Sequence, residues 1–356
     1  MQVSRDSESE EREEREAFRK LEEDLARSTP SIEELERALD RLARDVELAR
    51  DEKSAVLRDL ERVWHIMRLL KLLSEYFGDL IFFGGGAVVN YIYLVNVGEK
   101  PRFTFDLDSA WRRPAYAKRD VLRHFPLFNK WLAEMGFVLR IPVGRGRYGF
   151  LGIAEYDVEK DYFPSILSMR MPVLTRYTGE DFHSFLEIKD HGTLVKLRRA
   201  FEEVIGVRNP KIDYVRFEIA LGLREASVVR VELKDLFGST QSVLVTEPEL
   251  QLAWSITNRI GRSFDAPELA LHDILKSALD LRLSKYLSVN RVRDYVLRTE
   301  KPETIRANAA LNLRLLREKG FKEWAGHHYV LVRKVTTLED VIRSAEILIE
   351  NMPGTS

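Results

Sequence analysis

Two aspartates, Asp106 and Asp108, stand two positions apart in a stretch that alternates polar and apolar residues. Such alternation is typical of a β-strand, in which residues at i and i+2 point to the same face. The apolar Phe105 and Leu107 indicate a core strand, so two acids on its other face need a compensating cation. Paired carboxylates suit Mg²⁺ (or Mn²⁺), which prefers oxygen ligands and shares them with substrate phosphates. The pair therefore predicts a metal site that acts on a phosphorylated substrate.

Three consecutive glycines, Gly84, Gly85 and Gly86, follow the short apolar segment 80–83. The pattern predicts a buried strand that enters a glycine turn and then a helix over residues 87–95. Glycine lets the backbone approach a ligand without a Cβ clash, and N–H groups at a helix N-terminus form a site for a triphosphate. A run of glycines alone is more often a tight turn, but the two aspartates that follow favour an NTP site.

A third carboxylate commonly completes a site for two metal ions. The segment 212–223 is a strong strand prediction, and Glu218 within it is our candidate for that carboxylate. Asp213 is a rival on the same strand. The structural alternative for Glu218 is a cross-strand ion pair with Arg216 or Arg224, and the sequence leaves this choice open.

A later helical segment offers cations. Lys276 and Asp280 are spaced i,i+4, so one helix face presents both. Lysine suits a triphosphate as a point charge, and Arg282 suits a bidentate phosphate contact. From spacing alone, a helix salt bridge between Lys276 and Asp280 is the more common reading. Asp294 follows twelve residues after Arg282.

Together, these blocks resemble the AbiEii/AbiGii toxin family of the minimal nucleotidyltransferase superfamily. That pattern runs GG-x-A, then R-x-S-x-D-x-D, then E-[IV] followed by RE, then K-x-x-A-x-x-R, and finally [RK]-D-x-x-D. The corresponding segments here are Gly84 to Ala87, Arg102 to Asp108, Glu218-Ile219 with Arg224-Glu225, Lys276 to Arg282, and Arg293-Asp294. The resemblance covers roughly residues 78–300 and leaves the N-terminal helices and the tail unexplained.

The chain departs from the family pattern in two places that bear on the site. Thr104 stands where serine is usual, a change that keeps the hydroxyl. The second aspartate of the last block is replaced by Leu297, which weakens the assignment of Asp294.

The resemblance implies that Asp106 and Asp108 are metal ligands and that Lys276 binds the triphosphate and takes part in catalysis. It implies that Asp294 is a second active-site carboxylate, which orients Lys276 or acts as a base. The nucleotide-binding residues that we carry over by position are Gly84, Gly85, Thr104, Lys276 and Arg282.

The activity that this resemblance implies is transfer of NMP from an NTP to an acceptor. Some relatives use tRNA 3′ ends, and the toxin is neutralised by a separately encoded protein antitoxin. Two alternatives remain open at this point. A protein NMP-transferase would use the same site on a Tyr, Ser or Thr of a partner, and a catalytically inactive binding or scaffold protein would keep only the fold.

Composition and patterning exclude some classes of protein and indicate a fold. The 356 residues include no cysteine, which excludes disulfides and thiolate metal sites and favours a reducing cytoplasm. No segment has the pattern of a signal peptide or a membrane span. We expect an α+β chain with a nucleotidyltransferase fold, in which a mixed sheet is flanked by helices. The predicted domains are a helical extension over 1–77, a core with an inserted β element over 78–246, and a helical domain over 247–356.

Charge is uneven along the chain. Residues 1–60 hold 12 basic and 19 acidic residues, whereas residues 254–336 hold 16 basic and 9 acidic ones. The basic rear suits contact with nucleic acid, and ordinary solvated helix faces explain the pattern equally well.

Several further features are interpreted as structural. Residues 228–233 are predicted to form a strand that pairs with 212–223, and 330–333 a possible strand. Residues 116–135 are predicted to form a helix that Gly136 ends, and Ser31 with Glu34 indicates a capping box at the start of another helix. His327 and His328 are adjacent, and neighbours on a regular helix or strand do not share a face, so we expect no joint metal site. Trp111 is expected in the core. Arg145 and Arg147 are interpreted as a solvated hairpin tip.

Overall fold

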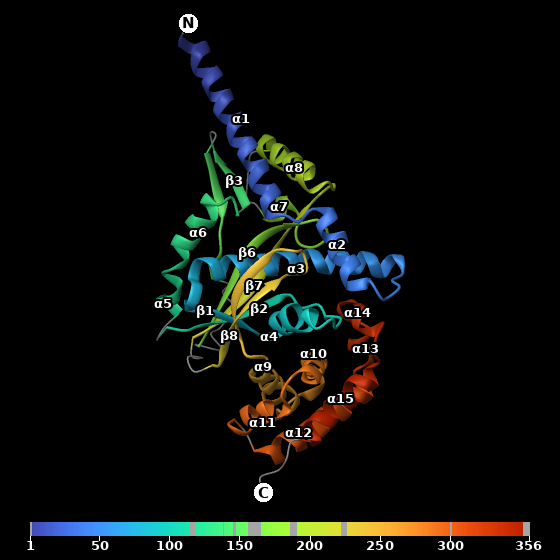
Figure 1. Ribbon diagram of the computed structural model, residues 1–356. Helices are drawn as coiled ribbons and strands as arrows, with labels where there is room; N and C mark the ends of the chain where they lie inside the picture. Colours follow the sequence, from blue (N-terminus) through green and yellow to red (C-terminus); the bar gives the residue numbers. More distant parts are fainter. Residues whose placement is uncertain are drawn as a thin grey trace.

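The computed structural model describes residues 2–113, 118–137, 139–144, 147–155, 165–185, 191–221, 226–299 and 301–351. Within them, seven strands form one mixed sheet in the order β5-β6-β7-β2-β1-β9-β8. Helices cover this sheet, α1 projects at one end of the molecule, and α9 to α15 gather at the other (Figure 1). The prediction of an α+β chain with a mixed sheet between helices is confirmed.

The strands of this sheet are β1 (Ile81–Gly84), β2 (Asp106–Trp111), β5 (Ala154–Glu155), β6 (Ile166–Thr175), β7 (Lys211–Ala220), β8 (Val228–Lys234) and β9 (Thr240–Thr246). A separate hairpin consists of β3 (Leu139–Gly144) and β4 (Arg147–Leu151). Its tip contains Arg145, which lies outside the described residues.

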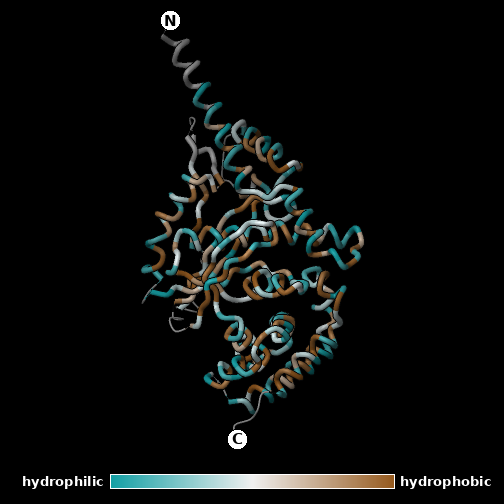
Figure 2. The backbone as a smooth tube through the Cα atoms, viewed as in Figure 1, coloured by the Kyte–Doolittle hydropathy of each residue, from teal (hydrophilic) through white to brown (hydrophobic). Residues whose placement is uncertain are grey.

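The N-terminal helices are α1 (Gln2–Ser28), α2 (Ile32–Ala43) and α3 (Arg50–Phe77). Ser31 and Glu34 form the capping box that begins α2, as the sequence indicates. The projecting part of α1 is mainly hydrophilic (Figure 2), but its last turns bury Leu21 and Leu25 in a small core with α8 (His191–Ile205).

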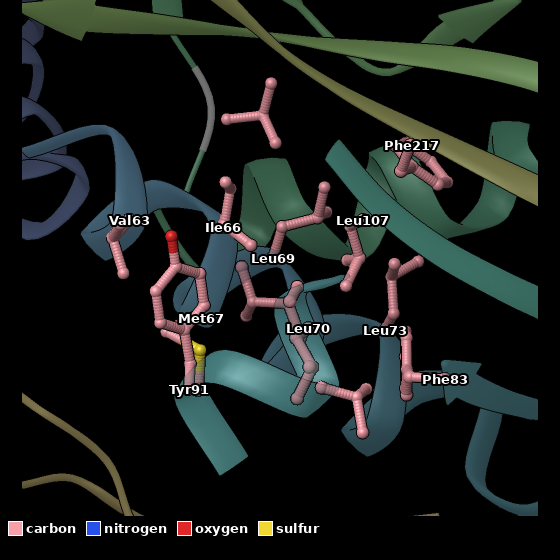
Figure 3. Close-up of a cluster of buried hydrophobic side chains, with 14 of the residues drawn as sticks. Val63, Ile66, Met67, Leu69, Leu70, Leu73, Phe83, Tyr91, Leu107 and Phe217 are labelled. Atoms are coloured by element: carbon pink, nitrogen blue, oxygen red, sulfur yellow. The ribbon is translucent and has the colours of Figure 1, made fainter. Parts of the chain in front are cut away.

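Helix α3 covers one face of the sheet. Its side chains at Ile66, Leu69 and Leu73 are fully buried, and they belong to the same cluster as Leu107 of β2 and Phe217 of β7 (Figure 3). Burial of this apolar surface fixes which way β2 and β7 face. The residues that alternate with Leu107 and Phe217 must therefore lie on the opposite face of the sheet.

The C-terminal helices have a hydrophobic core of their own, to which Val89 and Leu94 also contribute. The helices are α9 (Pro248–Ser255), α10 (Leu271–Asp280), α11 (Val289–Leu297), α12 (Pro302–Lys319), α13 (Phe321–Trp324), α14 (Val330–Arg333) and α15 (Leu338–Glu350). The domain division stays a prediction, and α3 shares the core of the sheet although we placed it in a separate extension.

Three expectations about secondary structure are wrong. The segment 228–233 pairs with β9 and not with β7, because β2 and β6 occupy both sides of β7. Residues 330–333 form the helix α14. The long helix expected before Gly136 is divided into α5 (Lys118–Leu122) and α6 (Phe125–Glu134), and a proline lies in the first turn of α6.

The remaining helices are short. The glycine turn leads into α4 (Gly85–Ala87) and a π-helical segment, η2 (Val88–Leu94), and α7 spans Phe182–Phe185. Among the described helices, none combines the length and apolar character that crossing a membrane requires.

Candidate active site

Strand register places three predicted site residues side by side. Asp108 of β2 faces Gly84 of β1 on one side and Glu218 of β7 on the other. Asp106, two positions before Asp108, lies opposite Arg216. Because residues two apart on a strand share a face, Asp106, Asp108 and Glu218 all project on the side of the sheet that α3 does not cover.

These carboxylates line a cleft of about 570 Å³. One wall is the sheet, including the glycine turn, Thr104 and the three acids. The other wall comes from the C-terminal helices, which contribute Gln251 of α9 and Lys276 and Asp280 of α10. The fold thus unites the glycine, aspartate and lysine blocks, which are far apart in sequence.

The glycine turn lies directly against the aspartates. Gly85 has a φ of +68°, and a Cβ on this residue would collide with the carboxylate of Asp108. A Cβ on Gly86 would lie only 2.8 Å from Nη2 of Arg102 and 3.2 Å from Oγ1 of Thr104. Two of the three glycines are therefore required by the close approach of site side chains, and not only by the turn.

Burial and neighbouring negative charges raise the pKa values of Asp108 and Glu218. Burial raises the pKa of Asp108 to about 6, and the negative charges of Glu218 and Asp106 add to this effect. The pKa of Glu218 is also raised, by burial first and then by the charge of Asp106. Clustered carboxylates of this kind favour a bound cation or a proton.

Arg102 and Asp280 form a buried pair at the back of the cleft. Nε and Nη2 of Arg102 donate to the two carboxylate oxygens of Asp280, at 3.0 and 2.8 Å. Asn90 donates to Asp280 at 3.0 Å and accepts from the backbone N–H of Arg102. Nη1 of Arg102 is buried and has no hydrogen-bond partner among the described residues, so the cleft wall contains one unused donor.

Lys276 is half-buried in the same wall. Its pKa is lowered by burial, and the positive charge of Arg102 lowers it further. The Lys276–Asp280 salt bridge that the spacing suggested is not formed, because Asp280 binds Arg102 instead. Two cations held close together beside a glycine turn are an arrangement that a bound anion would stabilise.

Two predicted site residues do not line the cleft. Arg282 is buried, and its guanidinium donates to the backbone oxygens of Leu279 and Lys100. Asp294 is exposed on α11, where it pairs with its neighbour Arg293 at 3.3 Å. The Arg224-Glu225 part of the pattern lies outside the described residues.

The rival carboxylate Asp213 also lies elsewhere, on the face of the sheet that α3 covers. Its Oδ2 accepts from the hydroxyl of Thr178 at 3.0 Å and lies 3.7 Å from Nε of Arg62.

Several residues of the cleft were missed in the sequence. Gln251, Trp254 and Arg259 recur at helical spacing along α9 and the π-helical segment η3 (Ile256–Ile260) and line the cleft. Gln251 accepts the backbone N–H of Gly85 at 3.0 Å, and Arg259 pairs with Asp273 at 2.7 Å. A polar helix face of this kind looks in the sequence like an ordinary solvated surface.

The two tryptophans near the site differ in environment. Trp111 packs in the core, with its ring 5.5 Å from that of Phe77, as the sequence analysis expects. Trp254 is half-buried and lines the cleft, where the other aromatic residues, Phe82 and Phe217, are almost fully buried.

No protein-family model matches the chain, and no curated protein sequence does. Among solved structures, the nucleotidyltransferase toxin MenT4 from Mycobacterium tuberculosis is similar, with a TM-score of 0.39 and 14% identity over 89% of this chain and 90% of that one. A likeness at this level carries no weight for the site, and the proposal below depends on the geometry of the cleft.

Proposed function

We propose that this chain is a metal-dependent nucleotidyltransferase that transfers NMP from an NTP to an acceptor hydroxyl. The observation that carries the proposal is the convergence of Asp106, Asp108 and Glu218 against the glycine turn, opposite Lys276. Carboxylates, a glycine turn and a buried cation are the parts that phosphoryl and nucleotidyl transfer require.

The residues fit a hard divalent cation such as Mg²⁺ or Mn²⁺. The donor set is all oxygen, and the charge of Asp106 is close enough to raise the pKa values of Asp108 and Glu218. When bound, such an ion would polarise the α-phosphate and align the attacking hydroxyl. The missing Cβ of Gly85 leaves the room that the Asp108 carboxylate occupies.

The chain's own residues would supply the rest of the site. Lys276 would bind the triphosphate, and Arg102, which Asp280 holds in place through two hydrogen bonds, would add positive charge beside it. Trp254 would stack on the base. Catalysis would then depend on positioning and on charge stabilisation, without a covalent intermediate on the protein.

We further propose an RNA acceptor, specifically a tRNA 3′ end, and a toxin role that a protein antitoxin neutralises. Support comes from the order of the sequence blocks that resemble the AbiEii/AbiGii family, and from exposed Arg216 and Arg259 on the cleft. A protein acceptor would use the same carboxylates, so the acceptor must be tested separately from the activity.

The test is incubation of the purified chain with each labelled NTP, Mg²⁺ and either total RNA or a protein extract. We expect label on a tRNA-sized band, and loss of at least about 100-fold in the Asp106→Ala variant. Asp265→Ala, which removes an exposed acid outside the cleft, is the matched control and should keep full activity.

Three outcomes separate the alternatives. Label on protein but not on RNA would favour the protein NMP-transferase. No label with any NTP or acceptor would favour a binding protein. Unchanged labelling in a folded Asp106→Ala variant would refute the metal assignment.

A further inference from the structure

A second cluster of possible metal ligands lies away from the cleft, between α3 and the C-terminal helices. Asp59 of α3 faces His327 and His328, which lie in a 3₁₀ turn, η6 (His327–Tyr329). The premise that adjacent histidines do not share a face is wrong here. In this turn the two rings lie with centroids 3.7 Å apart and both reach the same carboxylate.

Asp59 is the least exposed member of this cluster, with a side chain that is 1% exposed. Its Oδ2 lies 3.2 Å from Nδ1 of His328. Its Oδ1 is buried without a hydrogen-bond partner among the described residues, and the nearest imidazole atom, Nε2 of His327, is 3.6 Å away. A buried carboxylate oxygen without a partner is costly, and a cation at this position would satisfy it.

The distances suit a small tetrahedral ion. An ion 2.0–2.1 Å from each ligand separates pairs of ligand atoms by about 3.3 Å. Oδ2 of Asp59 lies 3.2 Å from Nδ1 of His328, and Oδ1 lies 3.6 Å from Nε2 of His327. One ligand atom from each of the three residues lies within 4.8 Å of the others, so a small shift of the side chains would bring all three to one ion. We propose that Asp59, His327 and His328 bind a transition-metal ion of the Zn²⁺ class, with water as the fourth ligand on the half-exposed side of His327.

Arg62 of α3 is directed to partners other than Asp59. Its guanidinium lies 4.2 Å from the Phe105 ring centroid, and its Nε lies 3.7 Å from Oδ2 of Asp213. The imidazole ligands also give this site a different metal preference from that of the cleft. Imidazole suits Zn²⁺, Ni²⁺ and Co²⁺, whereas all-oxygen sites suit Mg²⁺ and Mn²⁺.

The position of the site indicates what it does. The backbone oxygen of His328 accepts the N–H of Phe103 at 3.0 Å, and its ring lies edge-on to that of Phe105 at 4.9 Å. A bound ion would therefore join α3, the C-terminal helices and the segment that leads into β2. Its role is to stabilise this junction, and it does not depend on the proposed transfer activity.

Direct metal binding tests the proposal. The full chain, without a polyhistidine tag and stripped of metal, is titrated with ZnCl₂ by calorimetry in the presence of excess Mg²⁺. We expect one Zn²⁺ per chain and a rise in Tm of roughly 3–6 °C near saturation. Co²⁺ in place of Zn²⁺ should give the visible absorption of a tetrahedral ion.

The His327→Gln variant should weaken Zn²⁺ binding by at least about tenfold and remove the Tm rise. His327 is half-exposed, so this variant should fold, and Asp59→Asn provides a second, nearly isosteric test. His191→Gln, at an exposed histidine on α8, and Asp106→Ala, in the cleft, should both bind as the wild type does.

Two results would overturn the proposal. One is the absence of a Zn²⁺ site in the wild-type chain. The other is binding that survives in His327→Gln and Asp59→Asn but is lost in Asp106→Ala, which would place the ion in the cleft.

Discussion

The two faces of the central sheet hold the same residue types in opposite arrangements. On the cleft face, Asp106, Asp108 and Glu218 lie next to one another. On the face that α3 covers, acids are paired with bases. Glu61 accepts from the guanidinium of Arg176 at 2.8 Å and from its backbone N–H.

The difference shows that burial alone does not mark a functional acid. Burial raises the pKa of Glu61, as it does that of Asp108. Around Glu61 the charge and hydrogen bonds of Arg176 oppose the effect of burial, whereas around Asp108 the charges of Glu218 and Asp106 add to it. An acid cluster whose negative charges add to the effect of burial favours a bound cation, and this distinguishes the cleft from a structural ion pair.

The largest effect expected on the cleft face comes from Gly85→Ala. The new Cβ would displace the Asp108 carboxylate, and a shift of about 1 Å at a reacting centre costs about 100-fold in rate. Gly98→Ala is the matched control, because Gly98 also has a positive φ, +82°, but its Cβ would meet nothing within 4 Å. Rates of labelled-NTP transfer and Tm should be measured for both. Equal loss of activity in the two variants would mean that backbone strain, and not the Asp108 contact, is responsible.

A smaller effect is expected from neutralising acids on opposite faces of the same strand. Glu218→Gln keeps an oxygen ligand but removes its charge, so we expect transfer to fall roughly tenfold at limiting Mg²⁺. Asp213→Asn, on the α3 face, should leave transfer unchanged and lower stability slightly, because it weakens the contact with Arg62. A Mg²⁺ titration of transfer rates separates the two, and the reverse ranking would make Asp213 the third carboxylate.

A further comparison concerns stability and not transfer, at His65, a buried histidine on the α3 face. Its Nε2 lies 3.2 Å from the backbone oxygen of Leu174. Burial, reinforced by the charge of Arg68, lowers its pKa from 6.5 to about 3.

Between these two values the unfolded chain binds the proton and the folded chain does not. His65 therefore makes its full contribution to the free energy of unfolding above about pH 6.5. Below it, the free energy of unfolding falls by about 1.4 kcal/mol per pH unit. Urea unfolding from pH 7 to 4 should show a shallower slope in His65→Gln than in the wild type. An identical slope in the two proteins would contradict this assignment.

Local sequence patterns are sufficient to predict the residues at the centre of the site. Strand alternation set Asp106 and Asp108 on one face, and the glycine run identified the turn. Glu218 could be proposed because the apolar residues that alternate with it, such as Phe217, had to face the core.

The other wall of the cleft could not be predicted in this way. Gln251 and Arg259 line the cleft only because α9 packs against the glycine turn. This is a long-range contact, and the periodicity of the sequence does not predict it. The i,i+4 spacing indicates a salt bridge between Asp280 and Lys276 within one helix. In the structure the buried Asp280 carboxylate accepts two hydrogen bonds from Arg102 instead. His327 and His328 were dismissed because a regular helix or strand was assumed where the chain forms a 3₁₀ turn.

The carboxylate of Asp280 brings together three stretches of chain that are distant in sequence. Arg102 comes from the approach to β2, Asn90 from η2, and Asp280 itself from the end of α10. Removing α10 would take away the carboxylate that binds the Arg102 guanidinium, and it would leave the Asn90 amide with only the backbone oxygen of Gly86 as an acceptor. The C-terminal helices are thus part of the structure that holds positions 90 and 102, and a change at Asp280 should disturb both the sheet and the helices that cover the cleft.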